Sequence, residues 1–250
     1  MKQVLIVGGG GGLGSALVQR LLDQGYDVIV AGRTRPNEER LRRFYSADVA
    51  NADWPVLYRS IEEDTGRRID AVIFVAGTAV FGKTPLIPLE RARQTMDLNF
   101  WACTTAARSA AEYWDGQGHA GKFVAILSIV ARKAVPFESY YAASKAAASR
   151  FLECLQLEYA HTKMEFVCAY PGTLQTPFRR KAEWYGIEPV GGYEGANPHK
   201  TAEAVIKLLA GLRKNKVIGW RERGVDLAER ILPGLYDRLV LQPRVRKLLR

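Results

Sequence analysis

Five consecutive glycines near the amino terminus constrain the fold of this chain more than any other feature of its sequence. They follow an apolar, β-branched run at residues 4–7 and lead into an apolar-periodic segment at residues 13–18. This order predicts a strand, a tight turn and a helix. Glycine lets the backbone approach a ligand closely, and a helix amino terminus favours negative charge. The block therefore indicates a site for the phosphates of a dinucleotide.

The glycine block fits two spacings. One is GxGxxG beginning at Gly9, and the other is GxxxGxG through Gly8, Gly12 and Gly14. The second spacing is favoured because Gly8 follows the expected strand at once. It predicts that Gly8 makes the turn, Gly12 admits the pyrophosphate and Gly14 lets the helix pack on the sheet. An added side chain should then matter more at Gly12 than at Gly10.

Short β-rich runs alternate with amphipathic segments along most of the chain. The predicted strands are residues 2–7, 27–31, 71–75, 122–127, 164–169 and 216–219, and the predicted helices are 12–24, 89–113, 140–160 and 200–212. This pattern predicts an α/β fold with a Rossmann-type doubly wound parallel sheet of about seven strands and helices on both faces. We expect one domain over residues 1–250, with a substrate loop at about 177–198 and a C-terminal extension at about 221–250.

The composition indicates the cellular compartment of the chain and which kinds of partner to expect. The three cysteines, Cys103, Cys154 and Cys168, are odd in number and lack metal-ligand spacing, so we expect no metal, no disulfide framework and a cytoplasmic protein. The net charge is +10, but no recognised nucleic-acid module accompanies it, so no nucleic-acid partner is expected. The basic end of the chain, residues 242–250 beside the apolar residues 231–235, allows peripheral contact with anionic lipid, although one short basic tail binds membranes only marginally.

The end of the second predicted strand indicates the cofactor. In NAD-binding domains an acidic residue at this place binds the ribose 2′-hydroxyl. Here the sequence Val30-Ala-Gly-Arg-Thr-Arg35 contains no acid. The guanidinium of Arg33, beside Thr34 and with Arg35 as a second candidate, matches a 2′-phosphate in shape and charge. The sequence therefore predicts NADP(H) in preference to NAD(H).

A serine, a tyrosine and a lysine indicate acid–base chemistry. Tyr141 and Lys145 are four residues apart and share one face of a predicted helix. A nearby ammonium lowers the pKa of a phenol from about 10, which would make Tyr141 a usable acid or base. Ser128 follows the apolar run 123–127, where a hydroxyl at the end of a parallel strand can donate to a developing alkoxide.

Taken together, these motifs resemble the short-chain dehydrogenase/reductase family, in its branch of about 250 residues, over nearly the whole chain. The family's TGxxxGxG motif maps onto residues 7–14, with Val7 in place of threonine. The resemblance implies cofactor contacts at Gly8, Gly12, Leu13, Gly14, Arg33, Thr34, Asp48, Val49, Ala76, Gly77, Tyr141, Lys145, Pro171, Gly172, Leu174 and Thr176. Ala76 and Gly77 keep only half of the family's NNAG motif.

The resemblance also implies a reaction. We expect an NADP(H)-dependent oxidoreductase that acts on a ketone or secondary alcohol, with catalytic residues Ser128, Tyr141, Lys145 and Asn99. Tyr141 would exchange the proton, Ser128 would hold the oxygen, Lys145 would lower the Tyr141 pKa and bind the nicotinamide ribose, and Asn99 would bind a water in a proton relay. Two alternatives stay open: a non-catalytic or regulatory NADP(H)-binding protein, and an epimerase or dehydratase on the same fold.

Further expectations concern the partners of the chain. The predicted walls of the substrate pocket suggest a largely apolar carbonyl or alcohol; they are Val130, Val135, Phe178, Trp184 and Tyr185. The helix from Tyr141 onward is rich in alanine, and small residues allow close approach between helices. The resemblance implies that this helix and the helix beginning at Leu89 form the interface of a homodimer or homotetramer.

Overall fold

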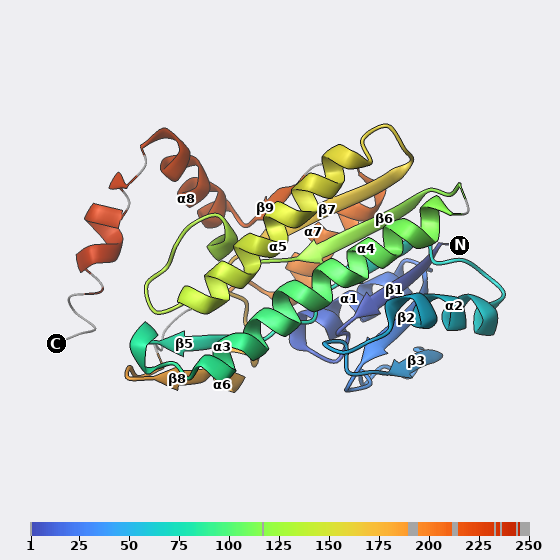
Figure 1. The fold of residues 1–250 in the computed structure, drawn as a ribbon, viewed down its shortest axis with the longest axis horizontal. Helices are drawn as coiled ribbons and strands as arrows, with labels where there is room; N and C mark the ends of the chain where they lie inside the picture. Colours follow the sequence, from blue (N-terminus) through green and yellow to red (C-terminus); the bar gives the residue numbers. More distant parts are fainter. Residues whose placement is uncertain are drawn as a thin grey trace.

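A computed structural model describes residues 2–116, 118–189, 195–211, 215–232, 234–235, 237–243 and 245. Its centre is a seven-stranded sheet in the order β3-β2-β1-β4-β6-β7-β9, in which all neighbours are parallel (Figure 1). The strands are β1 (Gln3–Val7), β2 (Asp27–Gly32), β3 (Arg43–Ser46), β4 (Ala71–Phe74), β6 (Gly121–Ile126), β7 (Met164–Pro171) and β9 (Lys216–Ile218). The predicted fold class is confirmed.

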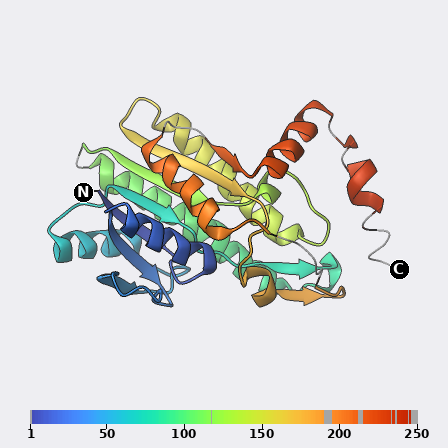
Figure 2. The same ribbon diagram turned by 180° about the vertical axis from the view of Figure 1, so that it is seen from behind.

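Helices cover both faces of this sheet. One layer contains α2 (Trp54–Thr65), α4 (Ala102–Asp115) and α5 (Ser139–Glu158), and the other contains α1 (Gly12–Asp23) and α7 (Pro198–Ala210) (Figures 1 and 2). Side chains of β1 alternate between the layers: Leu5 and Val7 join the α2, α4 and α5 core, whereas Val4 and Ile6 join the α1 and α7 core. Burial on both faces explains why the strands are nearly continuous apolar runs in the sequence.

In the first half of the chain, three elements of the sheet and its helices differ from the sequence prediction. β3 and α2 are absent from it, because RFYS is too polar and too short to stand out and α2 buries only three of its residues. The predicted helix at 89–113 consists of α3 (Leu89–Met96), a π-helical turn η2 (Asp97–Trp101) and α4. A continuous apolar periodicity does not reveal such a local change of pitch.

The expected substrate loop at 177–198 is partly ordered into secondary structure. It contains α6 (Phe178–Lys181) and β8 (Glu183–Tyr185), and β8 pairs in parallel with β5 (Val80–Gly82). A short helix η1 (Thr84–Leu86) follows β5. Residues 190–194 of the expected loop lie outside the described residues. The pairing is between segments about a hundred residues apart, which sequence periodicity cannot show.

The C-terminal extension contains α8 (Trp220–Ile231) and a π-helical turn η4 (Asp237–Leu241). Both lie beside the sheet and extend away from it in Figure 1. Within the part of the chain that the structure describes, no helix combines the length and apolar character needed to cross a bilayer.

The core beneath α4 depends on Trp114. This side chain is 2 % exposed, and its Nε1 donates to the Ile69 carbonyl oxygen at 2.8 Å. The indole lies over the first residue of β6, where a Cβ on Gly121 would come within 1.9 Å of the ring. Trp114 therefore joins α4, β6 and the residues that precede β4.

We expect Trp114→Ala to lower the free energy of unfolding by about 3–5 kcal/mol, because it leaves a large cavity and an unpaired carbonyl. Trp220→Ala is the matched control: Trp220 is 78 % exposed, and its loss should change that free energy by about 0.5 kcal/mol or less. Urea unfolding followed by circular dichroism measures both. Equal losses in the two variants would contradict this account of the core.

Candidate active site

The glycine loop joins β1 to α1 with almost no room for side chains. Gly8 has a φ of +93°, and its N–H donates to the Ala31 carbonyl at 2.8 Å. A Cβ at Gly8 would lie 2.6 Å from the backbone nitrogen of Ala76, and one at Gly14 would lie 2.4 Å from the Gly8 carbonyl oxygen. α1 begins at Gly12 with no side-chain cap and no acid in its first turn. The loop thus offers first-turn N–H groups and close backbone approach to a phosphate.

Leu13, the second residue of α1, is 7 % exposed and packs in the core beneath the helix.

Gly10 is more tightly packed than the sequence predicts. A Cβ at Gly10 would lie 2.5 Å from the Thr34 carbonyl oxygen, and a Cβ at Gly12 would lie 2.6 Å from Cγ2 of Thr176. The expected tolerance of Gly10 is therefore wrong, because the backbone after β2 crosses the glycine loop at this point. Gly11 is the open position, since the nearest atom to its Cβ would be 3.9 Å away.

The residues after β2 and β3 lie at the predicted adenosine end. Arg33 is exposed, whereas Arg35 donates through Nη2 to a carbonyl of its own loop, that of Leu41. Asp48 is exposed, and its carboxylate accepts from the Asn51 side chain at 2.8 Å and from the backbone N–H of residue 50 at 3.3 Å. Val49 packs in the core beside β2. The implied cofactor contacts of Asp48 and Val49 stay predictions.

The turn after β4 is braced by backbone bonds where the family motif has asparagines. The N–H groups of Val75 and Ala76 both donate to the Val7 carbonyl oxygen at 2.9 Å. A Cβ on Gly77 would lie 3.0 Å from Oδ1 of Asn99. The turn is thus held by β1 on one side and by the Asn99 side chain on the other.

Asn99 connects this turn to α5. It lies in η2 and is fully buried; Oδ1 accepts from the Thr78 N–H at 2.9 Å, and Nδ2 donates to the Thr78 carbonyl at 2.8 Å and to the Ser144 hydroxyl at 3.0 Å. Ser144 in turn donates to the Tyr141 carbonyl at 2.7 Å. One amide bond therefore holds the turn after β4 and the other holds the helix that carries Tyr141. The predicted water relay stays a prediction.

Ser128 and Tyr141 meet just beyond the carboxyl end of β6. The serine hydroxyl faces the phenol closely enough to lower the phenol pKa, and each residue is 8 % exposed. The Ser128 hydroxyl also accepts from the Val130 N–H at 3.3 Å, which starts the short helix η3 (Ile129–Ala131). Burial raises the pKa of Tyr141, and the Ser128 hydroxyl lowers it by less. The phenol is therefore protonated at neutral pH in this arrangement.

Lys145 lies one helical turn after Tyr141 and faces the turn after β4. Its Nζ donates to the Ile126 carbonyl at 3.3 Å, and a Cβ on Gly77 would lie 3.2 Å from that nitrogen. The residue is 4 % exposed, and burial lowers its pKa to about 8. The predicted lowering of the Tyr141 pKa by Lys145 is not borne out, because the ammonium faces Ile126 and Gly77 and not the phenol.

The segment after β7 closes the other side of the site. Pro171 is the buried last residue of β7. A Cβ on Gly172 would come within 2.0 Å of Oε1 of Glu222, so α8 covers this glycine directly. Leu174 makes an isolated parallel β-bridge, and Thr176 reaches the glycine loop at Gly12. The first and last predicted cofactor segments are thus in contact.

An apolar cluster surrounds Tyr141. Its buried members are Ala79, Phe81, Val130 and Tyr141, and the partly buried side chains against it are Ile129, Val135, Ala142, Phe178, Ala182 and Trp184. Four of the five predicted wall residues belong to it. The fifth, Tyr185, lies outside the cluster and hydrogen-bonds the Glu183 carboxylate.

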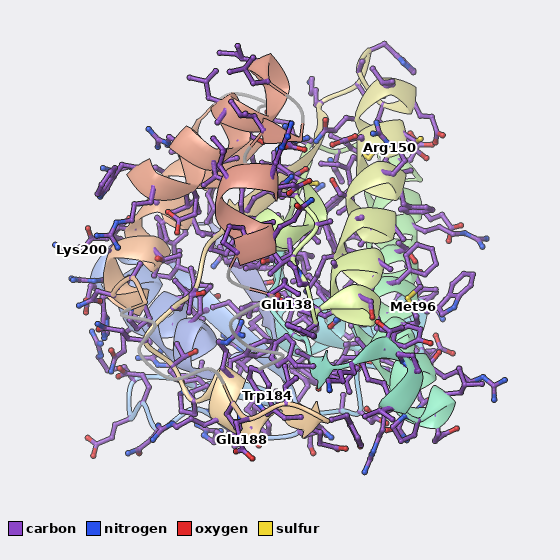
Figure 3. The ribbon with its side chains drawn as sticks, turned by 90° about the vertical axis from the view of Figure 1, so that its left-hand side faces the viewer. Met96, Glu138, Arg150, Trp184, Glu188 and Lys200 are labelled. Atoms are coloured by element: carbon purple, nitrogen blue, oxygen red, sulfur yellow. The ribbon has the colours of Figure 1, made fainter. Side chains whose placement is uncertain are left out.

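Sequence reasoning missed an ion pair beside Tyr141. Glu138, the N-cap residue of α5, accepts from Nη1 of Arg179 at 2.9 Å, and its side chain is 8 % exposed. The Arg179 guanidinium lies over the rings of Phe81 and Trp184, 4.5 and 5.3 Å from their centroids. Figure 3 shows Glu138 at the start of α5 and Trp184 on the segment below it. These residues come from three distant segments, so no local pattern could have revealed them.

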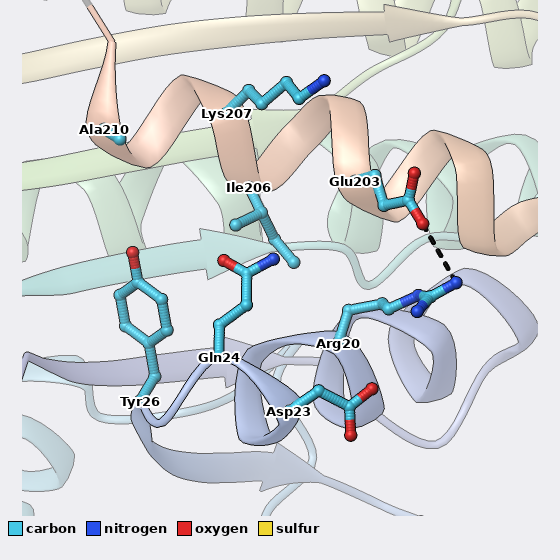
Figure 4. Close-up of a pocket in the computed structure, with 8 residues that line it drawn as sticks. All are labelled: Arg20, Asp23, Gln24, Tyr26, Glu203, Ile206, Lys207 and Ala210. Carbon is cyan, nitrogen blue, oxygen red and sulfur yellow. Dashed lines mark ion pairs between the residues drawn. The ribbon is translucent and has the colours of Figure 1, made fainter.

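A cavity of about 410 Å³ lies elsewhere, between the carboxyl end of α1 and α7 (Figure 4). It is lined by Arg20, Asp23, Gln24, Tyr26, Glu203, Ile206, Lys207 and Ala210. An ion pair of 2.9 Å between Arg20 and Glu203, both substantially exposed, crosses its mouth. None of the predicted site residues lines it, so it is separate from the chemistry described above.

The family model of the short chain dehydrogenases matches residues 2–184. The chain belongs to this family. A 3-ketodihydrosphingosine reductase of Bacteroides thetaiotaomicron is 27 % identical over 233 residues, covering 85 % of this short-chain dehydrogenase and 84 % of that protein. The resemblance expected from the glycine, serine, tyrosine and lysine motifs is therefore confirmed.

Solved structures agree with this family. A short chain dehydrogenase from Burkholderia cenocepacia in complex with NADP has a TM-score of 0.81 at 22 % identity, covering 96 % of this chain and 99 % of that one. A 3-ketoacyl-(acyl-carrier-protein) reductase from Brucella melitensis complexed with NADH has a TM-score of 0.74 at 20 % identity, covering 88 % and 98 %. These likenesses show the fold. As a member of its family, this short-chain dehydrogenase is an oxidoreductase of CH–OH groups that uses a nicotinamide cofactor.

We expect Gly14→Ala to weaken cofactor binding by roughly tenfold or more, because the new Cβ collides with backbone and forces α1 away from the loop. Gly11→Ala is the matched control and should bind cofactor within about twofold of the parent chain. Titration of reduced cofactor, followed by its fluorescence, measures both variants. Equal weakening would show that the GxxxGxG register is not the functional one.

Because Lys145 is buried, the free energy of unfolding should depend on pH. The pKa of Lys145 is about 8 in the folded chain and 10.5 in the unfolded chain. Between these two pH values the unfolded chain binds more protons than the folded chain. The free-energy cost of burying the charge is therefore fully present below pH 8 and disappears as the pH rises to 10.5. Lys145→Met should therefore stabilise the fold by about 1–3 kcal/mol at neutral pH, and the gain should shrink across this window. Urea unfolding at several pH values measures it. The exposed Lys163→Met is the control, and a gain independent of pH would contradict the assignment.

Proposed function

We propose that this short-chain dehydrogenase is an NADP(H)-dependent oxidoreductase of a ketone or secondary alcohol, with Tyr141 as the general acid and base. The observation that carries the proposal is the placement of the Ser128 hydroxyl beside the Tyr141 phenol, each residue 8 % exposed. Both residues lie just beyond the carboxyl end of β6, at the edge of the sheet where ligands of doubly wound folds bind. Lys145 lies one turn further along the same helix.

The residues present fit a nicotinamide dinucleotide. Side chains are sterically excluded at Gly8 and Gly14, and the Gly12 loop faces Thr176, so an extended ligand can run from the glycine loop to the segment after β7. Bound there, the cofactor would supply or accept the hydride. Lys145, whose Nζ lies by the turn at Gly77, is proposed to bind the nicotinamide ribose.

Proton transfer is assigned to Tyr141. Because burial raises its pKa, the phenol is held protonated and can donate to the carbonyl oxygen during reduction. Ser128 donates to the same oxygen as charge develops on it. Asn99 acts on this step by holding Ser144 and therefore α5 in place, and its part in a water relay is a further element of the proposal.

Preference for NADP(H) is assigned to Arg33. The guanidinium is exposed just beyond β2, beside Thr34, which lies over the glycine loop. Arg35 is engaged with its own loop and is the weaker candidate. The similar solved structures hold either NADP or NADH, so the preference is argued from Arg33 alone.

A largely apolar substrate is favoured by the cluster around Tyr141. Phe81, Val130, Phe178 and Trp184 contribute apolar surface next to the phenol. The relative named as a 3-ketodihydrosphingosine reductase acts, by its name, on a ketone, which agrees with a carbonyl at this site. The ion pair of Glu138 and Arg179 adds one polar contact for the substrate.

We further propose a homodimer or homotetramer that uses the α4 and α5 face in a cytoplasmic setting. Trp101, at the start of α4, is 57 % exposed, and Leu157, near the end of α5, is 79 % exposed. Each of these helices thus presents a large exposed apolar side chain, which supports an interface on this face. The three cysteines are free thiols, which agrees with a reducing compartment.

Tyr141→Phe should lower turnover of a carbonyl substrate by about 10²- to 10⁴-fold, because it removes the general acid, and should leave NADPH affinity nearly unchanged. Tyr140→Phe is the matched control on the adjacent residue and should retain activity. A panel of ketones, quinones and acyl thioesters, followed by loss of NADPH absorbance, provides the substrate, and cofactor fluorescence provides the affinity. Cofactor affinity lost in parallel with activity would argue against the assigned role.

Arg33→Ala should weaken NADPH binding by roughly tenfold or more through loss of a charge-assisted contact to the 2′-phosphate. NADH binding should change by about twofold or less, since that cofactor carries a 2′-hydroxyl. Parallel fluorescence titrations with both cofactors measure this, with Arg42→Ala as an exposed-arginine control. The same loss for NADPH and NADH would remove the basis for the NADP(H) preference.

A further inference from the structure

Helix α8 lies outside the family match at residues 2–184 and outside the core of the fold. All twelve of its residues are described, and none is buried. In Figure 1 it stands at the edge of the molecule, with the chain continuing away from the sheet. A helix of this length gains little stability by itself in water, so its contacts must hold it in place.

The acidic side chains of this region point toward the domain. Asp226 pairs with Arg132, and Lys133, whose side chain is 5 % exposed, pairs with Glu229 at 2.8 Å and Asp237 at 2.6 Å. Both cations immediately follow η3, the short helix that begins after Ser128. A fourth acid, Glu222, lies against Gly172 and Gly219. The negative charges are therefore turned inward and attach α8 and η4 to the domain.

The opposite side of α8 is apolar and exposed. Trp220, Leu227 and Ile231 are spaced by seven and four residues and share one helix face. They are 78 %, 57 % and 64 % exposed. The same character continues beyond the helix in Leu232, Leu235 and Leu239, which are also exposed.

Arginines border this apolar face. The side chains of Arg221, Arg223, Arg230 and Arg238 are all exposed, and Arg230 also pairs with Asp226 at 3.2 Å. The Arg221 guanidinium lies over the Trp220 ring, 5.2 Å from its centroid. Residues 244–250 add four more basic residues and no acid to the sequence. An apolar stripe bordered by arginine and containing tryptophan is the pattern of helices that lie in a membrane interface.

We propose that the α8 and η4 face binds the surface of an anionic lipid membrane. Its apolar side chains would enter the boundary between headgroups and acyl chains, and its arginines would contact anionic headgroups. A second copy of the chain fits this face less well. In a two-fold contact the same patch meets itself, which would bring arginines against arginines while the local acids are engaged on the inner side.

The proposal is tested by co-sedimentation of the full chain with two kinds of vesicle. One contains phosphatidylglycerol mixed with phosphatidylcholine, and the other contains phosphatidylcholine alone. We expect binding to the first, much weaker binding to the second, and release from the first as ionic strength rises. No binding, or equal binding to both vesicles, would overturn the proposal.

Substitutions on α8 test whether this face is the part of the chain that binds the vesicles. Leu227→Glu combined with Ile231→Glu should reduce binding to the anionic vesicles by roughly tenfold or more, and Arg221→Gln should reduce it by roughly fivefold. Val56→Glu, an exposed apolar site on α2, is the matched control and should bind like the parent chain. Unchanged binding in the α8 variants would overturn the assignment.

Two further measurements separate the remaining explanations. Light scattering gives the oligomeric state: an assembly that dissociates in the Leu227→Glu and Ile231→Glu variant, without vesicle binding by the parent chain, would identify a contact between copies and overturn the proposal. Thermal unfolding should be unchanged, since the substituted Leu227 and Ile231 side chains are 57 % and 64 % exposed. If that variant unfolds early, the Arg221→Gln result decides the outcome by itself.

Discussion

The active site depends on one steric constraint, the close backbone contact where β1 and β4 end beside the glycine loop. Gly8 donates to β2 and lies against Ala76, while Ala76 donates back to the carbonyl of Val7. Gly14 lies against Gly8 on the other side. Side chains would separate these segments, so the glycines set the position of α1, of the turn after β4, and through Asn99 of α5. The proposed cofactor site and Tyr141 are thus placed by a common set of backbone contacts.

Burial then sets the chemistry of the two titratable groups on α5. Desolvation disfavours charge on either group, so it raises the pKa of Tyr141 and lowers that of Lys145. The phenol is held as an acid, and the ammonium carries a stability cost that a purely structural lysine would avoid. A functional site that costs stability in this way is common, because charged groups must be kept where reactants meet.

The edge of the site is built by segments with few local constraints. The β5 and β8 pair brings the Phe81 and Trp184 rings together, and the Arg179 guanidinium lies over both. α8 covers Gly172 while it exposes apolar and basic side chains outward. Both additions attach to the carboxyl edge of a regular sheet, which is the edge where loop variation changes specificity without disturbing the core.

The sequence by itself determined the layered α/β fold, because most of its strands are apolar runs and most of its helices carry an apolar period. The motif glycines and Ser128 also follow directly on such apolar runs. It also indicated the family and most residues near the site. Only the tertiary structure decided that Lys145 points toward Ile126 and that Gly11 is the position of the glycine loop with room for a side chain. It also decided that Glu138 pairs with Arg179 and that acids of α8 face Arg132 and Lys133. These are contacts between segments far apart in the chain, and periodicity specifies which residues are buried or exposed but not which distant group each one meets.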